Sequence, residues 1–332
     1  MAMIYGSITF GDTSGDLTLR EVGAAQTFQL QLGDDATLVG DANALLNHAT
    51  GGADTFAVNT TGSLTIVGDA FNLANHALGG NDVIRAFATI NLEIYGDGFT
   101  MTDHARGGAD TIAVNGGLLS AIGVGDAETM IGFSVGGNDT MTAAGTRTQV
   151  HLYGDAVNMG GYARGGDDVL TANNPGPVLY GDARVLYGHA HGGDDLLTVQ
   201  GAPIGAPFPT TTTVYGDGEQ LLGHSVGGDD TLVGSTNQDI MYGDAAVVGP
   251  HARTGADLFV FSPSNGHDQI MDFEPGKDRI ELQGFGFAGF QDLASHFQTT
   301  ADGVLISFDT QDDILVRNVA VAQLHAHDFV LA

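Results

Sequence analysis

The clearest pattern in the chain is a short run of alternating apolar and polar residues that recurs about every 28 residues. One such run follows each GGxD tetrapeptide, as at Thr55–Val58 and Thr111–Val114. A second run precedes each Gly-Asp dipeptide, as at Leu64–Val67 and Thr213–Tyr215. Period-two alternation rich in β-branched and aromatic residues indicates strands. The pattern therefore predicts two short strands in each of about eight repeats.

Two aspartate positions mark every repeat. The Gly-Asp row consists of Asp41, Asp69, Asp97, Asp126, Asp155, Asp182, Asp217 and Asp244. The GGxD row consists of Asp54, Asp82, Asp110, Asp139, Asp168, Asp195, Asp230 and Asp257, the last in a degraded TGAD. The step from the first row to the second is 13 residues in all eight repeats, whereas the return step varies from 14 to 22. Lengthening a flexible surface loop costs little free energy, so a step of constant length indicates a structural constraint. One side of each repeat is therefore constrained in length, and the other side is free.

Repeats of this size bury their apolar faces only by stacking on their neighbours. We therefore predict an all-β fold, a right-handed parallel β-solenoid (β-roll or β-helix) of about eight coils. The expected divisions are an N-terminal cap and partial coil at 1–33, the repeats at 34–261 and a C-terminal β-rich cap at 262–332. Within that cap we expect a short helix at Gln291–Phe297 and strands at Gly303–Phe308 and Asp313–Val316.

The constrained side carries an apolar residue four positions after the Gly-Asp aspartate and a ring seven positions after it. This spacing predicts a short helical turn with one face packed inward. The ring column is His48, His76, His104, Phe133, Tyr162, His189, His224 and His251. Because Phe and Tyr replace the packing of an imidazole but not its metal ligation, we expect an aromatic stack. The alternative is a transition-metal site on the histidines.

Charge and composition exclude several functions. The chain has 332 residues, with 40 Asp and Glu against 10 Lys and Arg, a net charge of −30, 51 Gly and no Cys. The missing Cys excludes disulfides and thiolate sites, and the acidic excess argues against nucleic acid as a partner. No apolar run is long enough for a membrane span, and the first residues lack the pattern of a secretory signal peptide. Carboxylates that recur in every repeat, without a known catalytic motif, favour a protein that is not an enzyme.

The repeats resemble the glycine- and aspartate-rich repeats of the RTX (hemolysin-type calcium-binding) family. The stretch Gly255–Phe285 resembles the segment that follows such repeats, and His327–Ala332 resembles a type I secretion signal. The family nonapeptide is GGxGxDxUx, whereas here the fourth glycine is absent and each coil has one GGxD. We interpret Gly-Asp and GGxD as two halves of one turn, separated by the loop that carries the rings.

The resemblance implies that several Ca²⁺ ions bind the turns. The GGxD row matches a ligand position of the family, and Asp268 resembles the ligand of a last, degenerate repeat. The Gly-Asp row is a ligand candidate from its spacing, with hydrogen-bonded turn caps as the alternative. Ca²⁺ takes carboxylate and carbonyl oxygens, and stacked carboxylates repel one another without a cation.

The function expected from these observations is that of a secreted protein at the cell surface or in the matrix, folded by extracellular Ca²⁺ and exported by type I secretion machinery. A structural or adhesive role, with possible self-assembly, is the first interpretation. The alternative is a module that binds a sugar or host surface through the free-side loops, above all Gly201–Thr213. Neither nucleic acid nor a membrane span is expected.

Overall fold

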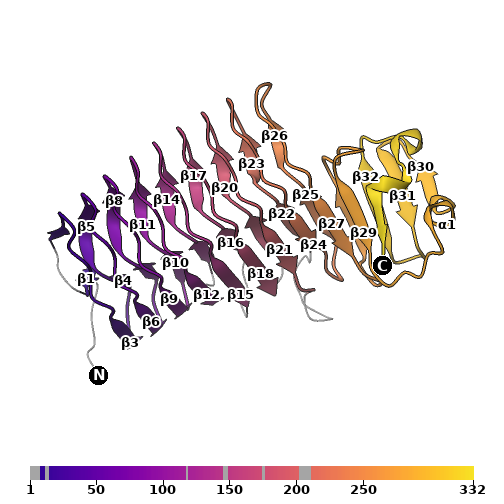
Figure 1. Cartoon of the computed structure of the whole chain (residues 1–332). Coiled ribbons are helices and arrows are strands. Elements are labelled where there is room, and N and C mark those ends of the chain that lie inside the picture. The colour runs from indigo at the N-terminus through magenta and orange to yellow at the C-terminus, as the bar shows by residue number, and fades with distance from the viewer. Residues whose placement is uncertain (1–7, 12–14, 117–118, 145–148, 174–175, 202–210) are drawn as a thin grey trace.

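Three long parallel sheets wind along the molecule, and each coil contributes one strand to each of them (Figure 1). This computed structural model describes residues 8–11, 15–116, 119–144, 149–173, 176–201 and 211–332. Equivalent positions of successive coils pair in register, as Ile66 does with Ile94. The predicted solenoid of about eight turns is confirmed, but each coil has three strands rather than the two that the sequence pattern predicted.

The strands fall into sheets named A, B and C here. Sheet A precedes the Gly-Asp steps and contains, in spatial order, β1 (Ile8–Phe10), β4 (Ala36–Val39), β7 (Leu64–Val67), β10 (Asn91–Tyr95), β13 (Ser120–Val124), β16 (Val150–Tyr153), β19 (Val178–Tyr180), β22 (Thr212–Tyr215), β25 (Asp239–Tyr242), β28 (His267–Ile270), β32 (Asp313–Arg317), β31 (Gly303–Ser307) and β30 (Phe297–Thr299). Sheet B follows them and contains β2 (Asp16–Leu17), β5 (Ala42–Leu46), β8 (Ala70–Ala74), β11 (Gly98–Met101), β14 (Ala127–Met130), β17 (Ala156–Met159), β20 (Ala183–Leu186), β23 (Gly218–Leu221) and β26 (Ala245–Val248). Sheet C follows the GGxD turns and contains β3 (Thr27–Leu32), β6 (Thr55–Thr60), β9 (Val83–Ala88), β12 (Thr111–Gly116), β15 (Thr140–Ala144), β18 (Val169–Asn173), β21 (Leu196–Val199), β24 (Thr231–Val233), β27 (Leu258–Phe261), β29 (Arg279–Leu282) and β33 (Phe329–Leu331).

Two separate apolar cores run side by side through the coils, and a third cluster of Val and Tyr side chains, such as Val67 and Tyr153, lies just before the Gly-Asp steps. The larger core lies between sheets A and C and contains fully buried side chains such as Phe56, Ile66 and Ile84. The smaller core lies behind sheet B and is built from rows of small and medium residues such as Leu45 and Ala49. We call the part of each coil between Gly-Asp and GGxD the fin, because it projects from the body along one edge (Figure 1). The strip between the two cores is called the waist.

The fin corrects the prediction of a helical turn on the constrained side. A sheet B strand leads out to a tight turn, and the chain then returns beside the next coil through single bridges such as Thr50 to Leu78. In seven of the eight coils the turn bends because the sixth residue after the Gly-Asp aspartate has a positive φ, as in Asn47 (53°) and Gly132 (81°). Asn, Asp and Gly tolerate this conformation better than other residues. A helix of the predicted kind cannot form through a left-handed residue.

The C-terminal segment closes the solenoid with a different arrangement. Strands β30, β31 and β32 form an antiparallel meander that continues sheet A from β28. The predicted helix is α1 (Phe290–Ala294), and two short 3-10 helices, η1 (Val321–Gln323) and η2 (Ala326–Asp328), lead into β33. The predicted strands at Gly303–Phe308 and Asp313–Val316 are present as β31 and β32. Most of the free-side loop Gly201–Thr213 lies outside the described residues, and among the described ones no helix could span a membrane.

Candidate metal centre

Both aspartate rows lie in the waist, with their carboxylates turned inward. Each Gly-Asp step ends a sheet A strand, and each GGxD turn begins a sheet C strand, so the two sequence signals face each other across the same coil. All sixteen side chains are at most 3% exposed. Burial of this many carboxylates is costly unless each one is paired or hydrogen-bonded, so the partners of each oxygen decide what the waist can do.

The Gly-Asp aspartates close the fin within their own coil. The backbone N–H of the second glycine of GGxD, eleven residues further along, donates to this carboxylate in every coil; for Gly166 and Asp155 the distance is 2.7 Å. The equivalent bonds to Asp126 and Asp182 measure 2.9 and 2.7 Å. Since one side chain must reach one defined N–H, the bond explains why the step of 13 residues does not vary.

The GGxD aspartates connect one coil to the next. The backbone N–H of each one donates to Oδ1 of its counterpart in the following coil, as Asp82 does to Asp110 at 2.7 Å. The ladder begins at Gln26, whose N–H donates to Asp54, and runs unbroken to Asp257. One carboxylate oxygen of each residue is therefore used as a backbone cap.

The second carboxylate oxygen of this row lacks a donor. Oδ2 is buried without a hydrogen-bond partner in seven GGxD aspartates of the described chain, namely Asp82, Asp110, Asp139, Asp168, Asp195, Asp230 and Asp257. It points at the glycine of the Gly-Asp step. A Cβ on Gly68 would lie 2.1 Å from Oδ2 of Asp82 and 1.7 Å from the carbonyl oxygen of Gly96. Carboxylate and carbonyl oxygens thus converge over a position that only glycine can occupy.

The Gly-Asp carboxylates also approach one another from coil to coil. The first glycine of GGxD lies between two of them: a Cβ on Gly107 would be 1.6 Å from Oδ1 of Asp126 and 2.5 Å from Oδ2 of Asp97. Burial, and then the charge of neighbouring aspartates, raises the pKa of Asp126 well above its ordinary value. The same two causes raise the pKa of Asp110 and Asp168.

Among the described residues, the cation that lowers these pKa values is Lys277, at the C-terminal end of the waist. Lys277 lowers the pKa of Asp244, but burial still raises that pKa to about 7. Burial and the charge of Asp244 raise the pKa of Asp257 to about 9. In the preceding coils the charges that raise these pKa values come from other aspartates, as at Asp182 and Asp217. The waist is therefore an anionic, oxygen-lined strip without a matching set of basic side chains.

Sequence reasoning missed two residues that extend these rows into the cap. Oδ1 of Asp278 accepts the N–H of Asp257 and so ends the GGxD ladder. Asp272 accepts the N–H groups of Gly243 and Asp244. The alternating strand β29 after Asp278 was the available signal, because every GGxD aspartate is followed by such a strand.

Asp268, in contrast, does not join either row. It lies on β28, where its Oδ1 accepts the N–H of Asp239 at 2.9 Å and its Oδ2 accepts the Asn265 amide at 2.7 Å. Burial, together with the charge of Asp239, raises the pKa of Asp268 to about 8. Asp268 therefore resembles the ligand of a last repeat in sequence but does not lie in the waist.

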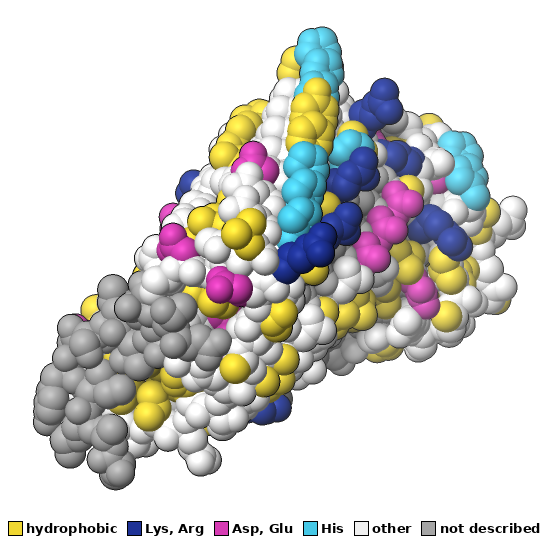
Figure 2. Space-filling view, turned by 60° about the vertical axis from the view of Figure 1, so that its left-hand side comes forward, with side chains coloured by type: hydrophobic (Ala, Val, Ile, Leu, Met, Phe, Trp, Pro, Cys, Tyr) yellow, Lys and Arg dark blue, Asp and Glu magenta, His cyan; other side chains and the backbone are white. Residues whose placement is uncertain are grey.

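The ring column forms a continuous ridge along the tip of the fin (Figure 2). Successive rings from His48 to His251 stack with centroids 4.5–5.1 Å apart and planes within 22° of parallel. The expected aromatic stack is confirmed. The lone pairs of an imidazole lie in its ring plane, so near-parallel stacked rings do not aim two nitrogens at one ion. This geometry disfavours the alternative of a transition-metal site on the column.

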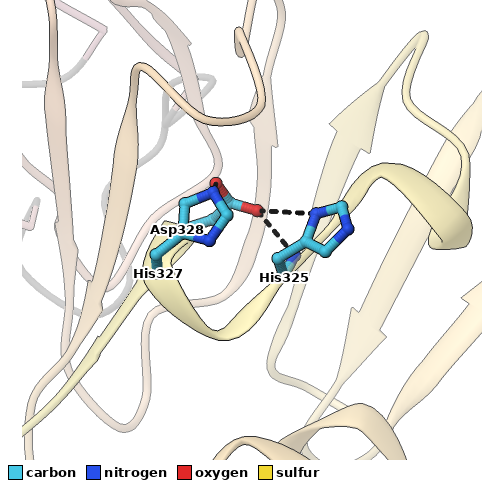
Figure 3. Close-up of side chains that lie close together, drawn as sticks. All are labelled: His325, His327 and Asp328. Carbon is cyan, nitrogen blue, oxygen red and sulfur yellow. Dashed lines mark hydrogen bonds and ion pairs between the residues drawn. The ribbon is translucent and has the colours of Figure 1, made fainter.

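A second cluster of ligand-type atoms lies at the C-terminus. His325, His327 and Asp328 place one such atom each within 4.8 Å of one another (Figure 3). The Asp328 carboxylate is buried, and it accepts the N–H groups of Gly276 at 2.8 Å and of His325 at 2.6 Å. The two rings are more than half exposed and border it. Both carboxylate oxygens therefore already anchor the last segment to the loop before β29.

Comparison with known families bears on the last third of the solenoid and the cap. The family described as peptidase M10 serralysin C terminal matches residues 186–332. This part of the chain is therefore similar to the C-terminal domain of serralysins. No curated protein and no solved structure matches the chain. The matched family is the RTX-repeat region of secreted proteins and is not itself catalytic.

The residues present fit the calcium chemistry that is general to serralysin-type RTX domains. The donors in the waist are oxygens throughout, both carboxylate and glycine carbonyl, and hard cations such as Ca²⁺ prefer these ligands. The unpartnered buried Oδ2 atoms supply negative charge where no protein donor reaches. The glycines that a Cβ would crowd keep the carbonyls within reach of that charge.

Proposed function

We propose that the protein is exported and then folded by extracellular Ca²⁺, and that it acts as a rigid structural or adhesive element outside the cell. The observation that carries this proposal is the row of buried Oδ2 atoms without donors in the waist. A second row of buried carboxylates faces it, and basic side chains approach only at the cap. Such an arrangement is stable at neutral pH only if cations replace the missing donors.

The candidate ligands are the GGxD aspartates Asp54, Asp82, Asp110, Asp139, Asp168, Asp195, Asp230 and Asp257. The glycine carbonyls of the Gly-Asp steps would assist them. The Gly-Asp aspartates Asp41, Asp69, Asp97, Asp126, Asp155, Asp182, Asp217 and Asp244 would contribute charge and a share of the ligands while they cap the fin. Bound Ca²⁺ supplies positive charge that offsets the desolvation and mutual repulsion of these carboxylates.

Folding would then be linked to ion binding. Where Ca²⁺ is scarce, the aspartates repel and the coils resist stacking, so the chain stays extended for passage through a type I secretion system. Where Ca²⁺ is abundant, binding to the folded state adds directly to its stability. The folded product offers stacked coils, an exposed ring ridge and a closed C-terminal end, which suits a scaffold better than an enzyme.

The test is a far-UV circular dichroism titration of chelator-stripped protein at pH 7.5, with Ca²⁺, Mg²⁺ and Zn²⁺ in parallel. We expect a cooperative gain of β-structure with Ca²⁺ alone. Equal β-content and equal melting curves in chelator and in Ca²⁺ would overturn the proposal. A response specific to Zn²⁺ would contradict it as well and would redirect attention to the histidines.

A further inference from the structure

The outer surface of sheet C differs in charge from the rest of this acidic chain. The strands β3, β6, β9, β12, β15, β18, β21, β24 and β27 contain no Asp or Glu. The whole chain has 40 acidic residues. Arg85 on β9 is the one charged side chain in this set of strands. Electrostatic repulsion of an anionic ligand by acidic side chains is therefore expected to be weakest on this face.

A groove of about 420 Å³ opens on this face, over the first four strands of the sheet. Asn59, Phe87 and Asn115 occupy equivalent positions of three successive coils, so an amide flanks the phenyl ring on each side. Arg85 lies on the same face two residues before Phe87, and its partner in the preceding coil is Ala57. The short alanine side chain leaves the space that the longer neighbours enclose. The volume is in the range of small-ligand sites.

The polar groups around the groove are not used within the fold. In the described part of the chain, the side chains of Gln31, Asn59, Arg85 and Asn115 have no hydrogen bond or ion pair, and Phe87 is 42% exposed. Amides offer both donors and acceptors, and a guanidinium offers a planar fork of donors. An open aromatic face offers an apolar surface of fixed orientation. A ligand can therefore engage these polar groups without breaking a hydrogen bond or an ion pair of the described chain.

We propose that this groove binds a saccharide that carries carboxylates, namely a short oligomer of a uronic acid. One face of a sugar ring packs on Phe87, and the amides of Asn59 and Asn115 exchange hydrogen bonds with its hydroxyls. Arg85 pairs with the sugar carboxylate in the two-pronged geometry that guanidinium and carboxylate share. The described residues that line the groove all belong to sheet C strands, and none of them belongs to the waist. The proposal requires the folded solenoid but not the calcium assignment.

The experiment is isothermal titration of the full chain with trimers of galacturonic acid and, as the neutral probe, trimers of β-linked glucose. Both titrations use constant millimolar Ca²⁺, with circular dichroism to establish the fold of every variant. We expect the acidic trimer to bind more tightly than the neutral one. Arg85→Gln should weaken the acidic trimer at least tenfold and leave the neutral one unchanged. Phe87→Ala should weaken the acidic trimer at least tenfold as well.

Two matched controls separate the groove from general effects. Arg184→Gln removes an equal charge from an exposed position of sheet B, and Phe133→Ala removes an exposed ring from the fin tip. Both should change the affinity less than twofold. Failure of the acidic trimer to bind, equal affinity for both trimers, or equal effects of Arg85→Gln and Arg184→Gln would overturn the proposal. Folding without Ca²⁺ would refute only the calcium-driven function, because the binding test would still apply.

Discussion

The backbone N–H of Asp139 donates to Oδ1 of Asp168, its counterpart one coil further along the chain, at 2.6 Å. Asp139 in turn accepts the N–H of Asp110 through its own Oδ1. The carboxylates therefore hold adjacent coils together while their other oxygens lack donors. The same residues are stabilising as hydrogen-bond acceptors and destabilising as buried charges, and the balance depends on what neutralises them.

Asp139→Asn should change stability in opposite directions with and without Ca²⁺. An amide keeps an acceptor for Asp110 and can donate to the carbonyl of Gly154, which lies beside Oδ2. In chelator at pH 7.5 we expect the variant to be more stable than the wild type by about 1–3 kcal/mol, because a buried charge is removed. In Ca²⁺ titrations its midpoint should rise at least tenfold. Asp167→Asn, at the exposed position that precedes Asp168 in the next coil, is the control, and a shift in the same direction under both conditions would refute the ligand assignment.

The metal-free protein should be more stable in acid than at neutral pH. Burial raises the pKa of Asp155 and Asp244 to about 7 and that of Asp257 to about 9, against about 3.9 in an unfolded chain. A folded-state pKa above the unfolded value means that stability is complete below about pH 4 and is lost as the pH rises through about 7 and then about 9. In chelator the melting temperature should therefore be highest near pH 4.5 and fall as the pH rises, until the β-structure is lost near neutral pH. A rise over that range would contradict the buried acidic waist, and saturating Ca²⁺ should flatten the dependence.

Gly125→Ala should disrupt the waist from the backbone side. The added Cβ would meet the carbonyl oxygen of Gly154 at 1.7 Å and Oδ2 of Asp139 at 2.1 Å. Since neither the carbonyl nor the hydrogen-bonded carboxylate can move freely, we expect a loss at or above the upper end of about 1–3 kcal/mol seen on overpacking. Gly33→Ala is the control, because no atom lies within 4 Å of its added Cβ. Denaturation in Ca²⁺ measures both, and equal losses would show that the contact is unimportant.

How far the sequence predicts this structure is clear from individual positions. The constant step from Asp126 to Asp139 predicts a turn of fixed geometry, and the hydrogen bond from Gly137 to Asp126 is its cause. The hydrogen bond from Asp139 to Asp168 joins two coils, so the sequence of a single repeat does not predict it. The prediction of a helical turn was wrong because Asn47, Asn75 and Gly132 have positive φ values that force a reversal despite the helical spacing of the apolar residues. Asp272 and Asp278 were missed because their loop has no Gly-Gly.

Ser134→Ala should stabilise the fin. Ser134 is fully buried at a position where the coils on either side have Ala105 and Ala163. In the described chain its Oγ has no hydrogen-bond partner. Removing an unsatisfied hydroxyl should raise the free energy of unfolding by about 1 kcal/mol. The reciprocal variant Ala163→Ser should lower it by a similar amount, and no change in either variant, measured by urea denaturation in Ca²⁺, would mean that the hydroxyl is satisfied.

Asp328→Ala should release the C-terminal segment. The substitution removes the acceptor for the N–H groups of Gly276 and His325. We expect faster amide exchange over η2 and β33 and a loss of about 1.5–3 kcal/mol for each charged hydrogen bond. His325→Ala retains both backbone bonds and is the matched control. Equal exchange in the two variants would assign the anchoring to the packing of Phe329 instead.

The aspartate ladder also gives the stack a polarity. Every GGxD carboxylate accepts a hydrogen bond from a backbone N–H of the coil before it, and Asp278 of the cap accepts one from the last coil. A coil at the C-terminal edge of a truncated stack would therefore keep an unsatisfied buried N–H, whereas a coil at the N-terminal edge would only release a carboxylate oxygen. Assembly that starts at the cap and adds coils toward the N-terminus completes each ladder bond as it proceeds. The C-terminal cap thus closes the solenoid and also offers the acceptor on which the next coil can form.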